Sequence, residues 1–413
     1  MFSLYFLLVG ARLSKYCNFR YEEYKNEDNS FLKIDDKSNK TYSLYIHIPF
    51  CENLCEFCFF HKFLYNEHSI IKYYKALIDE IDLISKRNFH INNIYIGGGT
   101  PTIYLPGLIS LLEKINSRFN IDSISIETDP SHINGQVIRL LKDANVNRLS
   151  IGIQSFNEHV LNKAGRINKT SIEEIKENII AACEVFNTVN VDLIFNVKKQ
   201  NIMHINFDIE KVLELCPQQI TYYPIMEHNK GLFDDIANAN KERKIYYYII
   251  DYLQKCYSMN SVWSFASKKN IYDEYLVDNP EFLCAGCGAF GYYQERLYAN
   301  AFNLDNYINS VNKGKLPIVA YKKLNAFEKI LYFLTIKLYS LEFNEYEFTE
   351  ILDKMDYKLY KTIINCLKIG NIVYLDRGYV KLTKNGLYLW LNVMKQFYIN
   401  VNTFREFCRI KQL

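Results

Sequence analysis

The sequence predicts an α/β fold, in which a partial (β/α)6 barrel is followed by a smaller α-rich, winged-helix-like domain. Between residues 42 and 224, short stretches rich in β-branched and aromatic residues alternate six times with longer stretches of helical apolar spacing. This alternation indicates a parallel sheet covered by helices, and six units are too few for a complete (β/α)8 barrel. After Pro224 the alternation stops, and helical patterns dominate from about residue 318.

The strands of the barrel are predicted where β-branched and aromatic residues run together, at residues 42–48, 94–96, 123–127, 148–154, 189–195 and 219–224. Helices are predicted between them, at residues 69–86, 106–119, 134–143, 170–186 and 206–215. The second of these helices begins with Pro106, and Thr170 with Glu173 forms a candidate capping box at the start of the fourth.

Beyond the barrel, the sequence predicts a helix at 241–256, strands at 263–268 and 297–302, helices near 324–341, 346–353 and 356–368, and a hairpin at 371–382 before a last helix. Helices with a small hairpin resemble a winged helix, but no dense basic helix accompanies them. We expect a lid or a substrate-side wall rather than a DNA-binding module. The predicted division is an N-terminal segment (1–40), a core barrel with a substrate-side extension (41–310) and a C-terminal domain (311–413).

Composition favours a cytoplasmic protein. The net charge of +3 is too small to indicate binding to nucleic acid or to a membrane surface. Eleven cysteines, mostly scattered, fit the reducing cytosol better than a secreted disulfide framework. The apolar run at 2–11 is shorter than the ~20 residues that span a bilayer and lacks the basic start of a signal peptide. We expect it to pack on the protein, with membrane contact as the alternative and no stable insertion.

Three thiols lie close together directly after the first predicted strand. Cys51, Cys55 and Cys58 have the spacing C-x3-C-x2-C, and thiolates are the preferred ligands of iron–sulfur clusters and zinc. A structural zinc site needs four protein ligands, and His61 could be the fourth. Three ligands suit a cubane cluster in which one iron stays open to a small molecule.

The C-x3-C-x2-C loop with Phe57 before its last cysteine resembles the cluster loop of radical S-adenosylmethionine (SAM) enzymes. The wider stretch from Tyr45 to Cys51, YIHIPFC, is similar to the branch that contains oxygen-independent coproporphyrinogen III dehydrogenase, heme chaperones and anaerobic heme-degrading methyltransferases. The resemblance implies a [4Fe–4S] cluster that chelates SAM and cleaves it to a 5′-deoxyadenosyl radical. It also implies that Tyr45 and Phe57 contribute to the cofactor site.

Two later motifs match the family's site for the first SAM. The glycine-rich turn GGGTP after the second strand would usually be no more than a turn, but its place resembles the family's site for the SAM amino group. The resemblance assigns Gly98 to the first SAM, and Gly99 and Thr100 to a second one. Glu127 ends the third strand, where the family pattern has a SAM-binding carboxylate. Alone, it would be read as a surface acid.

Gln154, Arg166 and Asp192 resemble the positions that hold a second SAM in the dehydrogenase branch. An amide, a cation and a carboxylate could clamp an amino-acid group through charge-assisted hydrogen bonds. Each of them alone would be read as a structural polar residue. The resemblance therefore implies one SAM, and a second if these residues act together.

The chain departs from the family in two places. The usual glycine and proline after the fifth strand are missing from FNVKKQN, and the dehydrogenases' additional cysteine is replaced by Phe59-Phe60. Both weaken the match to the dehydrogenase itself. Cys284 and Cys287 could suggest a second metal site, but no further cysteine pair accompanies them, and GCGA resembles the family's glycine-rich turn.

The function implied by the resemblance is radical chemistry on a tetrapyrrole, as in coproporphyrinogen III oxidation. The alternatives are a radical SAM methyltransferase acting on heme or another substrate, and a heme chaperone without turnover. The expected partners are a tetrapyrrole or another small-molecule substrate and a reducing electron donor of the flavodoxin or ferredoxin type, with no nucleic acid.

Overall fold

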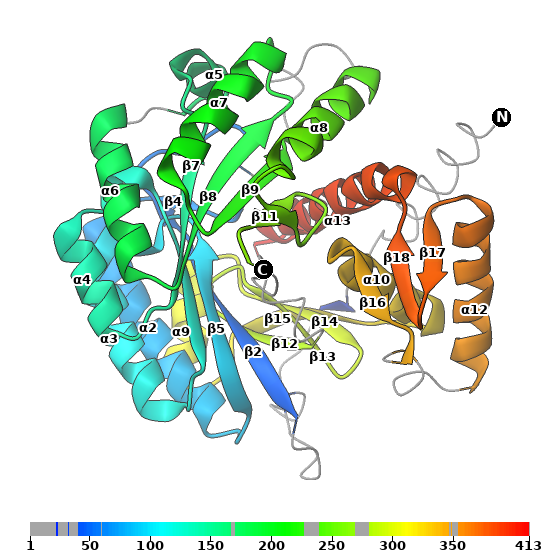
Figure 1. Cartoon of the computed structure of the whole chain (residues 1–413). Helices are drawn as coiled ribbons and strands as arrows, with labels where there is room; N and C mark the ends of the chain where they lie inside the picture. Colours follow the sequence, from blue (N-terminus) through cyan, green and yellow to red (C-terminus); the bar gives the residue numbers. More distant parts are fainter. Residues whose placement is uncertain are drawn as a thin grey trace.

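The computed structural model describes residues 22–23, 32, 40–58, 60–166, 170–226, 239–268, 281–346, 348 and 354–412. The N-terminal run at 2–11 and most of the helix predicted at 346–353 lie outside these residues. The fold is mixed α/β with a large sheet whose centre is parallel and a helical C-terminal region, as predicted (Figure 1).

Six adjacent parallel strands form the centre of the sheet. They are β2 (Thr41–Ile48), β5 (His90–Gly98), β6 (Ser123–Thr128), β7 (Arg148–Gln154), β8 (Thr188–Phe195) and β9 (Gln219–Pro224). Most of their residues are buried, with exposed fractions near zero at Leu44, Ile96 and Val191. β-Branched and aromatic residues are frequent in these strands, which explains why they could be recognised in the sequence.

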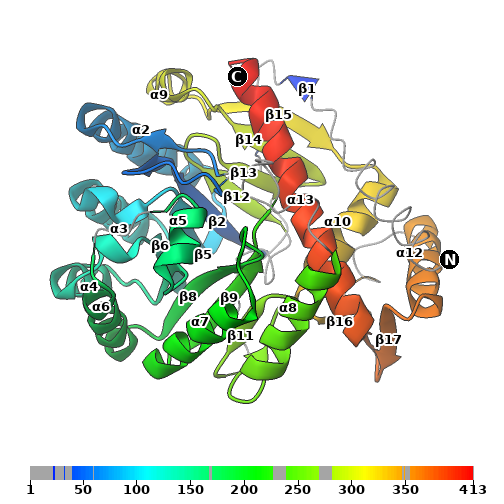
Figure 2. The same cartoon turned by 90° about the horizontal axis from the view of Figure 1, so that it is seen from above.

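Helices cover the outside of the curved sheet (Figure 2). They are α2 (Glu67–Ser85), α3 (Leu105–Arg118), α4 (Gly135–Asp143), α6 (Ile172–Val185) and α7 (Ile202–Leu215). The predicted capping box is displaced by one residue, because the Ser171 side chain accepts from Glu174 N and caps α6 in place of Thr170. The short helix α5 (Glu158–Lys163), capped by Asn157, was not predicted.

The sheet continues on both sides of the six strands. On one side, β12 (Phe282–Ala285) pairs in parallel with β2, and β13 (Phe290–Tyr293), β14 (Arg296–Asn300), β15 (Ile318–Lys323) and β1 (Glu22–Glu23) follow in antiparallel order. On the other side, β11 (Ser264–Ala266) and β10 (Ser258–Met259) pair antiparallel beyond β9. The predicted division at residue 311 stays a prediction, and β15 joins this sheet just beyond it.

The C-terminal region combines α10 (Ala326–Tyr339), α12 (Lys354–Ile369) and α13 (Lys384–Ile410) with the small antiparallel sheet of β16 (Glu342–Asn344), β18 (Tyr379–Leu382) and β17 (Val373–Asp376). Two further helices, α8 (Ala239–Leu253) and α9 (Leu304–Asn312), precede it. Across the described ranges, none of the helices has both the length and the apolar character needed to cross a membrane.

Helix α13 runs from the small sheet back along the open side of the partial barrel (Figure 2). The ring of Tyr398 packs against Trp263, next to β11, with 6.0 Å between centroids. One and a half turns further on, Phe404 packs against Phe290 of β13 at 5.5 Å. The helix thereby connects two strands that lie on opposite sides of the six-stranded centre.

Candidate functional site

A cavity of about 340 Å³ opens at the carboxyl ends of the barrel strands, and this volume lies within the usual range of ligand pockets. All residues that the sequence predicts for the site line it: Tyr45, Cys51, Cys55, Phe57, Cys58, Gly98, Gly99, Thr100, Glu127, Gln154, Arg166 and Asp192. They come from six separate stretches of the chain and meet because parallel strands end at one edge of a sheet.

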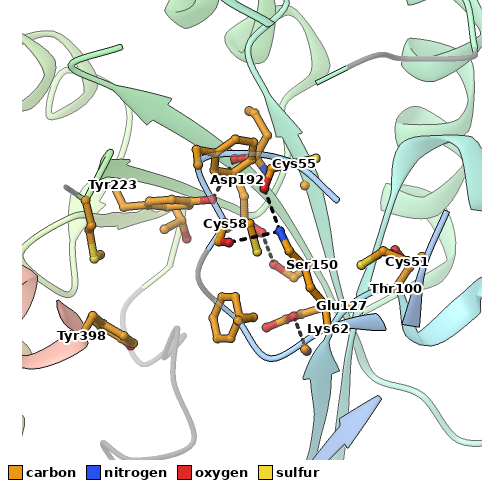
Figure 3. A pocket seen from close by; sticks show the side chains of 18 of the residues that line it. Cys51, Cys55, Cys58, Lys62, Thr100, Glu127, Ser150, Asp192, Tyr223 and Tyr398 are labelled. Carbon is orange, nitrogen blue, oxygen red and sulfur yellow. Dashed lines mark hydrogen bonds between the residues drawn. The ribbon is translucent and has the colours of Figure 1, made fainter. Parts of the chain in front are cut away.

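The cysteine loop is fixed by backbone hydrogen bonds at its base. Phe63 N donates to the carbonyl of Pro49 at 2.6 Å, which pairs β4 (Phe63–Leu64) with β3 (Phe50–Cys51). Inside the loop, Lys62 Nζ donates to the carbonyl oxygens of Cys55 and Cys58 at 2.7 and 3.1 Å (Figure 3). The ammonium group thus stands at the loop that carries the thiols, where it would favour negative charge on them.

Burial raises the pKa of the Cys51 thiol to about 12, and the neighbouring Cys58 adds to the rise. Burial also raises the pKa of Cys55, against the opposing charge of Arg166. A metal binds the thiolate, so a cluster held by these thiols would displace their protons. Its loading would then release protons and become easier as the pH rises.

The donor set fits an iron–sulfur cluster, because three thiols from one short loop line one cavity and thiolates are the ligands of such clusters. Among the described residues, no three His, Cys, Asp or Glu side chains converge closely enough to hold a single metal ion. Thiolates that each bind a different iron need not converge on one point.

His61, the candidate fourth zinc ligand, is not among the residues that line the cavity. It is buried behind the loop, where its ring packs edge-on against Phe63 and Phe302. Its Nε2 lies 3.8 Å from Cys287 Sγ. In this structure, His61 therefore does not complete a tetrahedral set with the three loop thiols.

Glu127 is held beside the glycine-rich turn. Its carboxylate accepts from Gly98 N at 3.0 Å and from the Tyr95 hydroxyl at 2.8 Å. Gly98 has a φ of +117°, and a Cβ there would stand 2.6 Å from the His47 ring. A Cβ at Gly99 would stand 2.4 Å from the carbonyl oxygen of Phe50. Packing alone thus demands both glycines, whatever the cavity binds.

Tyr45 is oriented by the same histidine. The geometry fits a neutral His47 whose Nε2–H donates to the carbonyl of His61 at 2.8 Å, with the Tyr45 hydroxyl donating to Nδ1 at 2.7 Å. Burial lowers the pKa of His47 to about 3, which supports the neutral ring. The Tyr45 oxygen keeps acceptor capacity in the cavity.

Gln154, Arg166 and Asp192 also line the cavity, and Figure 3 shows Asp192 beside Ser150. Gln154 Oε1 accepts from the Tyr223 hydroxyl at 2.7 Å. Asp192 accepts from the Ser150 hydroxyl at 2.8 Å and from the Asn190 amide at 2.8 Å. The parallel pairing of β7 with β8 places Ser150 next to these two residues.

Two hydrogen bonds hold the Arg166 side chain in place. Its Nη2 donates to Asp129 Oδ2 at 2.7 Å and to the carbonyl of Gly152 at 2.6 Å. An amide, a cation and a carboxylate are therefore held in place around one space, which is the arrangement that could bind an amino-acid group.

Several lining residues were missed by the sequence reasoning. The supports Lys62, Asp129, Ser150 and Tyr223 carry no motif of their own. The aromatic part of the lining contains Trp263, Phe282, Phe290, Tyr332, Phe397 and Tyr398, and α13 also contributes Val401 and Arg405. The spacing of 397, 401 and 405 on one face of a helix was a signal that could have indicated this wall.

Cys284 and Cys287 do not form part of the cavity lining. Both are buried, and burial raises the pKa of both thiols well above the usual value. Cys287 N donates to the Tyr73 hydroxyl oxygen at 3.3 Å, and Cys284 N to the Tyr298 hydroxyl oxygen at 3.1 Å. These contacts describe two packed core residues of the β12 strand and its following turn.

Comparison with known proteins adds to this geometry. The model of the radical SAM superfamily matches residues 45–212. The heme chaperone HemW of Lactococcus lactis subsp. lactis is 29% identical over 386 residues, which cover 87% of this chain and 98% of the relative. The oxygen-independent coproporphyrinogen III oxidase of Escherichia coli is 37% identical over 195 residues, 44% of this chain and 41% of the enzyme.

A solved structure extends the likeness in fold. Coproporphyrinogen III oxidase from Escherichia coli, described as a radical SAM enzyme, superposes with a TM-score of 0.73 at 23% identity. The match covers 88% of this chain and 90% of the other. The barrel and the helical C-terminal region therefore belong to one shared architecture.

Proposed function

We propose that the chain cleaves SAM to act on a tetrapyrrole, because residues 45–212 match the model of the radical SAM superfamily. This match implies a [4Fe–4S] cluster and SAM as cofactors. We assign the cluster to Cys51, Cys55 and Cys58. The observation that carries the proposal is that every residue predicted for the cluster and for SAM lines one cavity.

When bound and reduced, the cluster and SAM supply a 5′-deoxyadenosyl radical that can take a hydrogen atom from a substrate. The chain's own residues bind, orient and exclude water. In this proposal Tyr45 and Phe57 would contact the first SAM, the turn at Gly98 would offer backbone groups to its amino group, and Glu127 would offer a fixed carboxylate to its ribose.

A second SAM is proposed at Gly99, Thr100, Gln154, Arg166 and Asp192. The last three are held by Tyr223, by Asp129 and by Ser150 with Asn190, so little side-chain freedom would be lost on binding. Polar groups held in fixed positions on rigid elements favour the binding of one specific ligand.

The tetrapyrrole is proposed from two kinds of support. The relatives named above are a heme chaperone and a coproporphyrinogen III oxidase. The aromatic side chains in the cavity lining suit a large flat ring. We place the protein in the cytoplasm, where thiols stay reduced and an electron donor of the flavodoxin or ferredoxin type can reach the cluster.

Heme chaperoning without turnover is a second candidate, because the heme chaperone from Lactococcus lactis matches along 98% of its length. Such a protein would keep the cluster and bind heme tightly. It would produce no 5′-deoxyadenosine in the presence of heme.

Product analysis tests these proposals. Protein reconstituted without oxygen is mixed with SAM, dithionite and either heme or coproporphyrinogen III. We expect 5′-deoxyadenosine, with carbon dioxide if propionate side chains are decarboxylated or S-adenosylhomocysteine if a methyl group is transferred. Tight heme binding without 5′-deoxyadenosine would support the chaperone. Protein that assembles a cluster but yields no 5′-deoxyadenosine and binds neither tetrapyrrole would contradict both.

Matched cysteine variants identify the cluster ligands. Cys58→Ala should lose the [4Fe–4S] signal in electron paramagnetic resonance. Cys366→Ala removes an exposed thiol on α12 and should keep it. Equal iron content in the two variants would contradict the assignment of the cluster to this loop.

A further inference from the structure

The cavity has two chemically different parts. Polar groups at the strand ends form one part, while Trp263, Phe290, Tyr332, Phe397 and Tyr398 contribute aromatic surface to the other. The residues assigned above to the cluster and to SAM occupy the polar part, apart from Phe57. The aromatic part therefore remains for the substrate.

One basic side chain stands in this aromatic part. Arg405 lines the cavity, is 7% exposed, and lies on the face of α13 that also carries Phe397 and Val401. Its guanidinium carbon lies 5.3 Å from the ring centroid of Phe60 and 5.3 Å from that of Phe290. Contacts with ring faces fix the plane of a guanidinium group, whose N–H donors point outward within that plane.

The charge of Arg405 reaches the border of the polar part. It opposes the burial-driven rise in the pKa of Tyr45, and it adds to the effect of burial that lowers the pKa of His47. Lys62 lies at the cysteine loop, and Arg166 lies beside Asp129, both at the strand ends. Arg405 lies instead beside the aromatic side chains of the lining.

We propose that Arg405 is a specificity-determining residue that binds a carboxylate of the substrate and so sets how a flat, carboxylate-bearing macrocycle lies in the cavity. This inference rests on the proposed function. A macrocycle can pack on the aromatic side chains, but its carboxylates can enter the cavity only if they are paired. A guanidinium group pairs with a carboxylate through two parallel hydrogen bonds.

The test compares a carboxylate with its ester. Heme carries two propionates, and heme dimethyl ester has the same ring without the charges. Binding of each to the reconstituted full-length protein is measured by absorbance titration in a mild detergent. We expect Arg405→Met to weaken heme binding by about 10- to 100-fold, the usual value of a charge-assisted pair, and to leave binding of the ester unchanged.

Two further variants distinguish the loss of this contact from a loss of folding. Arg409→Met removes a cation one turn further along α13, where Arg409 is 58% exposed and pairs with Glu406, and it should bind both ligands as the wild type does. Arg405→Lys keeps the charge and should recover part of the preference for heme. Cluster content of all variants is compared by electron paramagnetic resonance.

Each outcome decides a different question. Equal weakening of heme and of its ester in Arg405→Met would overturn the carboxylate contact and leave a packing role. Unchanged binding of both would overturn it as well. If the wild type binds neither ligand, the tetrapyrrole proposal fails, and this inference fails with it. If the wild type prefers heme but Arg405→Met keeps that preference, the proposed function stands and only Arg405 is wrongly assigned.

Discussion

At the scale of single residues, the site depends on side chains that are fixed before a ligand arrives. Glu127 is held by a backbone N–H and a tyrosine hydroxyl, and Tyr45 by a buried histidine. Such support reduces the entropy lost on binding and sets the direction of each group. Even a substitution that barely changes the volume of such a side chain should therefore weaken ligand binding.

Glu127→Gln is the first such change. The Tyr95 hydroxyl and Gly98 N both donate to the carboxylate. The uncharged amide of glutamine has one oxygen, so its NH₂ group would face one of these donors. We expect the SAM dissociation constant to rise about 10-fold, the effect of losing one charge-assisted hydrogen bond. Isothermal titration of the reconstituted protein measures it.

Glu113→Gln, an exposed position on α3, is the control and should leave SAM affinity unchanged. Equal SAM affinity in Glu127→Gln and the wild type would show that the carboxylate is a structural support of the glycine turn and not a ligand.

Gly98→Ala tests the turn itself. A side chain at a φ of +117° is strained, and its Cβ would stand 2.6 Å from the His47 ring. We expect the free energy of unfolding to fall by about 1 to 2 kcal/mol for the backbone, with a further cost of about 1 to 3 kcal/mol for the crowding.

Gly314→Ala separates the two effects, because Gly314 also has a positive φ, +71°, but nothing lies within 4 Å of its Cβ position. Urea denaturation should show a clearly smaller loss for this variant. Equal losses would mean that the His47 ring moves aside without cost.

At the scale of elements, α13 is held to the barrel by a buried charge. Glu242 of α8 is 2% exposed and accepts from Lys395 Nζ at 2.6 Å, from Asn196 Nδ2 at 2.8 Å and from the Tyr388 hydroxyl at 3.1 Å. Two of these donors lie on α13, and Asn196 follows β8. The carboxylate thus joins three elements beside the cavity.

Lys395→Met should leave the Glu242 carboxylate buried without its cation. Breaking a buried pair in this way costs about 3 kcal/mol or more in the free energy of unfolding, which urea denaturation measures. The loosened α13 should also bind heme less tightly.

The matched control is Lys384→Met on the same helix. Lys384 pairs with Asp251 at 3.8 Å, and both side chains are more than 60% exposed, at 69% and 66%. Exposed pairs of this kind contribute at most about 1 kcal/mol. Similar losses in the two variants would contradict a special role for the Glu242 contact.

Elements differ in how far the sequence determines them. Strands β7 and β9 were predicted with the bounds that the structure has, because β-branched and aromatic residues are concentrated in them. Helix α5 was missed because six residues are too few to show a period. Strand β15, with the polar residues Lys322 and Lys323, was missed because its pairing with β14 decides its conformation.

The same distinction applies to the site. Cysteines, glycines and strand-end acids could be predicted because their spacing along the chain is the signal. Their supports could not, because the contacts of Tyr223 with Gln154 and of Ser150 with Asp192 arise from the alignment of separate strands. Strand register is a tertiary property that no local pattern contains.

At the scale of the whole molecule, α13 spans the open side of the partial barrel, and a second buried acid joins neighbouring elements that lie far apart in the sequence. Glu80 of α2 accepts from the Gly286 backbone N–H and from Asn300 Nδ2, each at 2.8 Å, and from the Tyr307 hydroxyl. These partners lie more than 200 residues further along the chain. The contact therefore connects the first helix of the barrel with the added strands.

Burial raises the pKa of Glu80 to about 7, against the opposing effect of its three hydrogen bonds. The folded protein thus holds a proton that the unfolded chain, with a pKa near 4.5, gives up. The contribution of Glu80 to the free energy of unfolding is fully present below pH 4.5 and is lost as the pH rises toward 7.

Wild-type protein should gain unfolding free energy from Glu80 on acidification from pH 7 to pH 5, whereas Glu80→Gln has no such group. The difference in unfolding free energy between the two proteins, measured by urea denaturation at each pH, should therefore shift in favour of the wild type as the pH falls. All other titrating groups are common to both proteins and cancel in that difference, so two parallel curves would mean that Glu80 stays ionised in the fold.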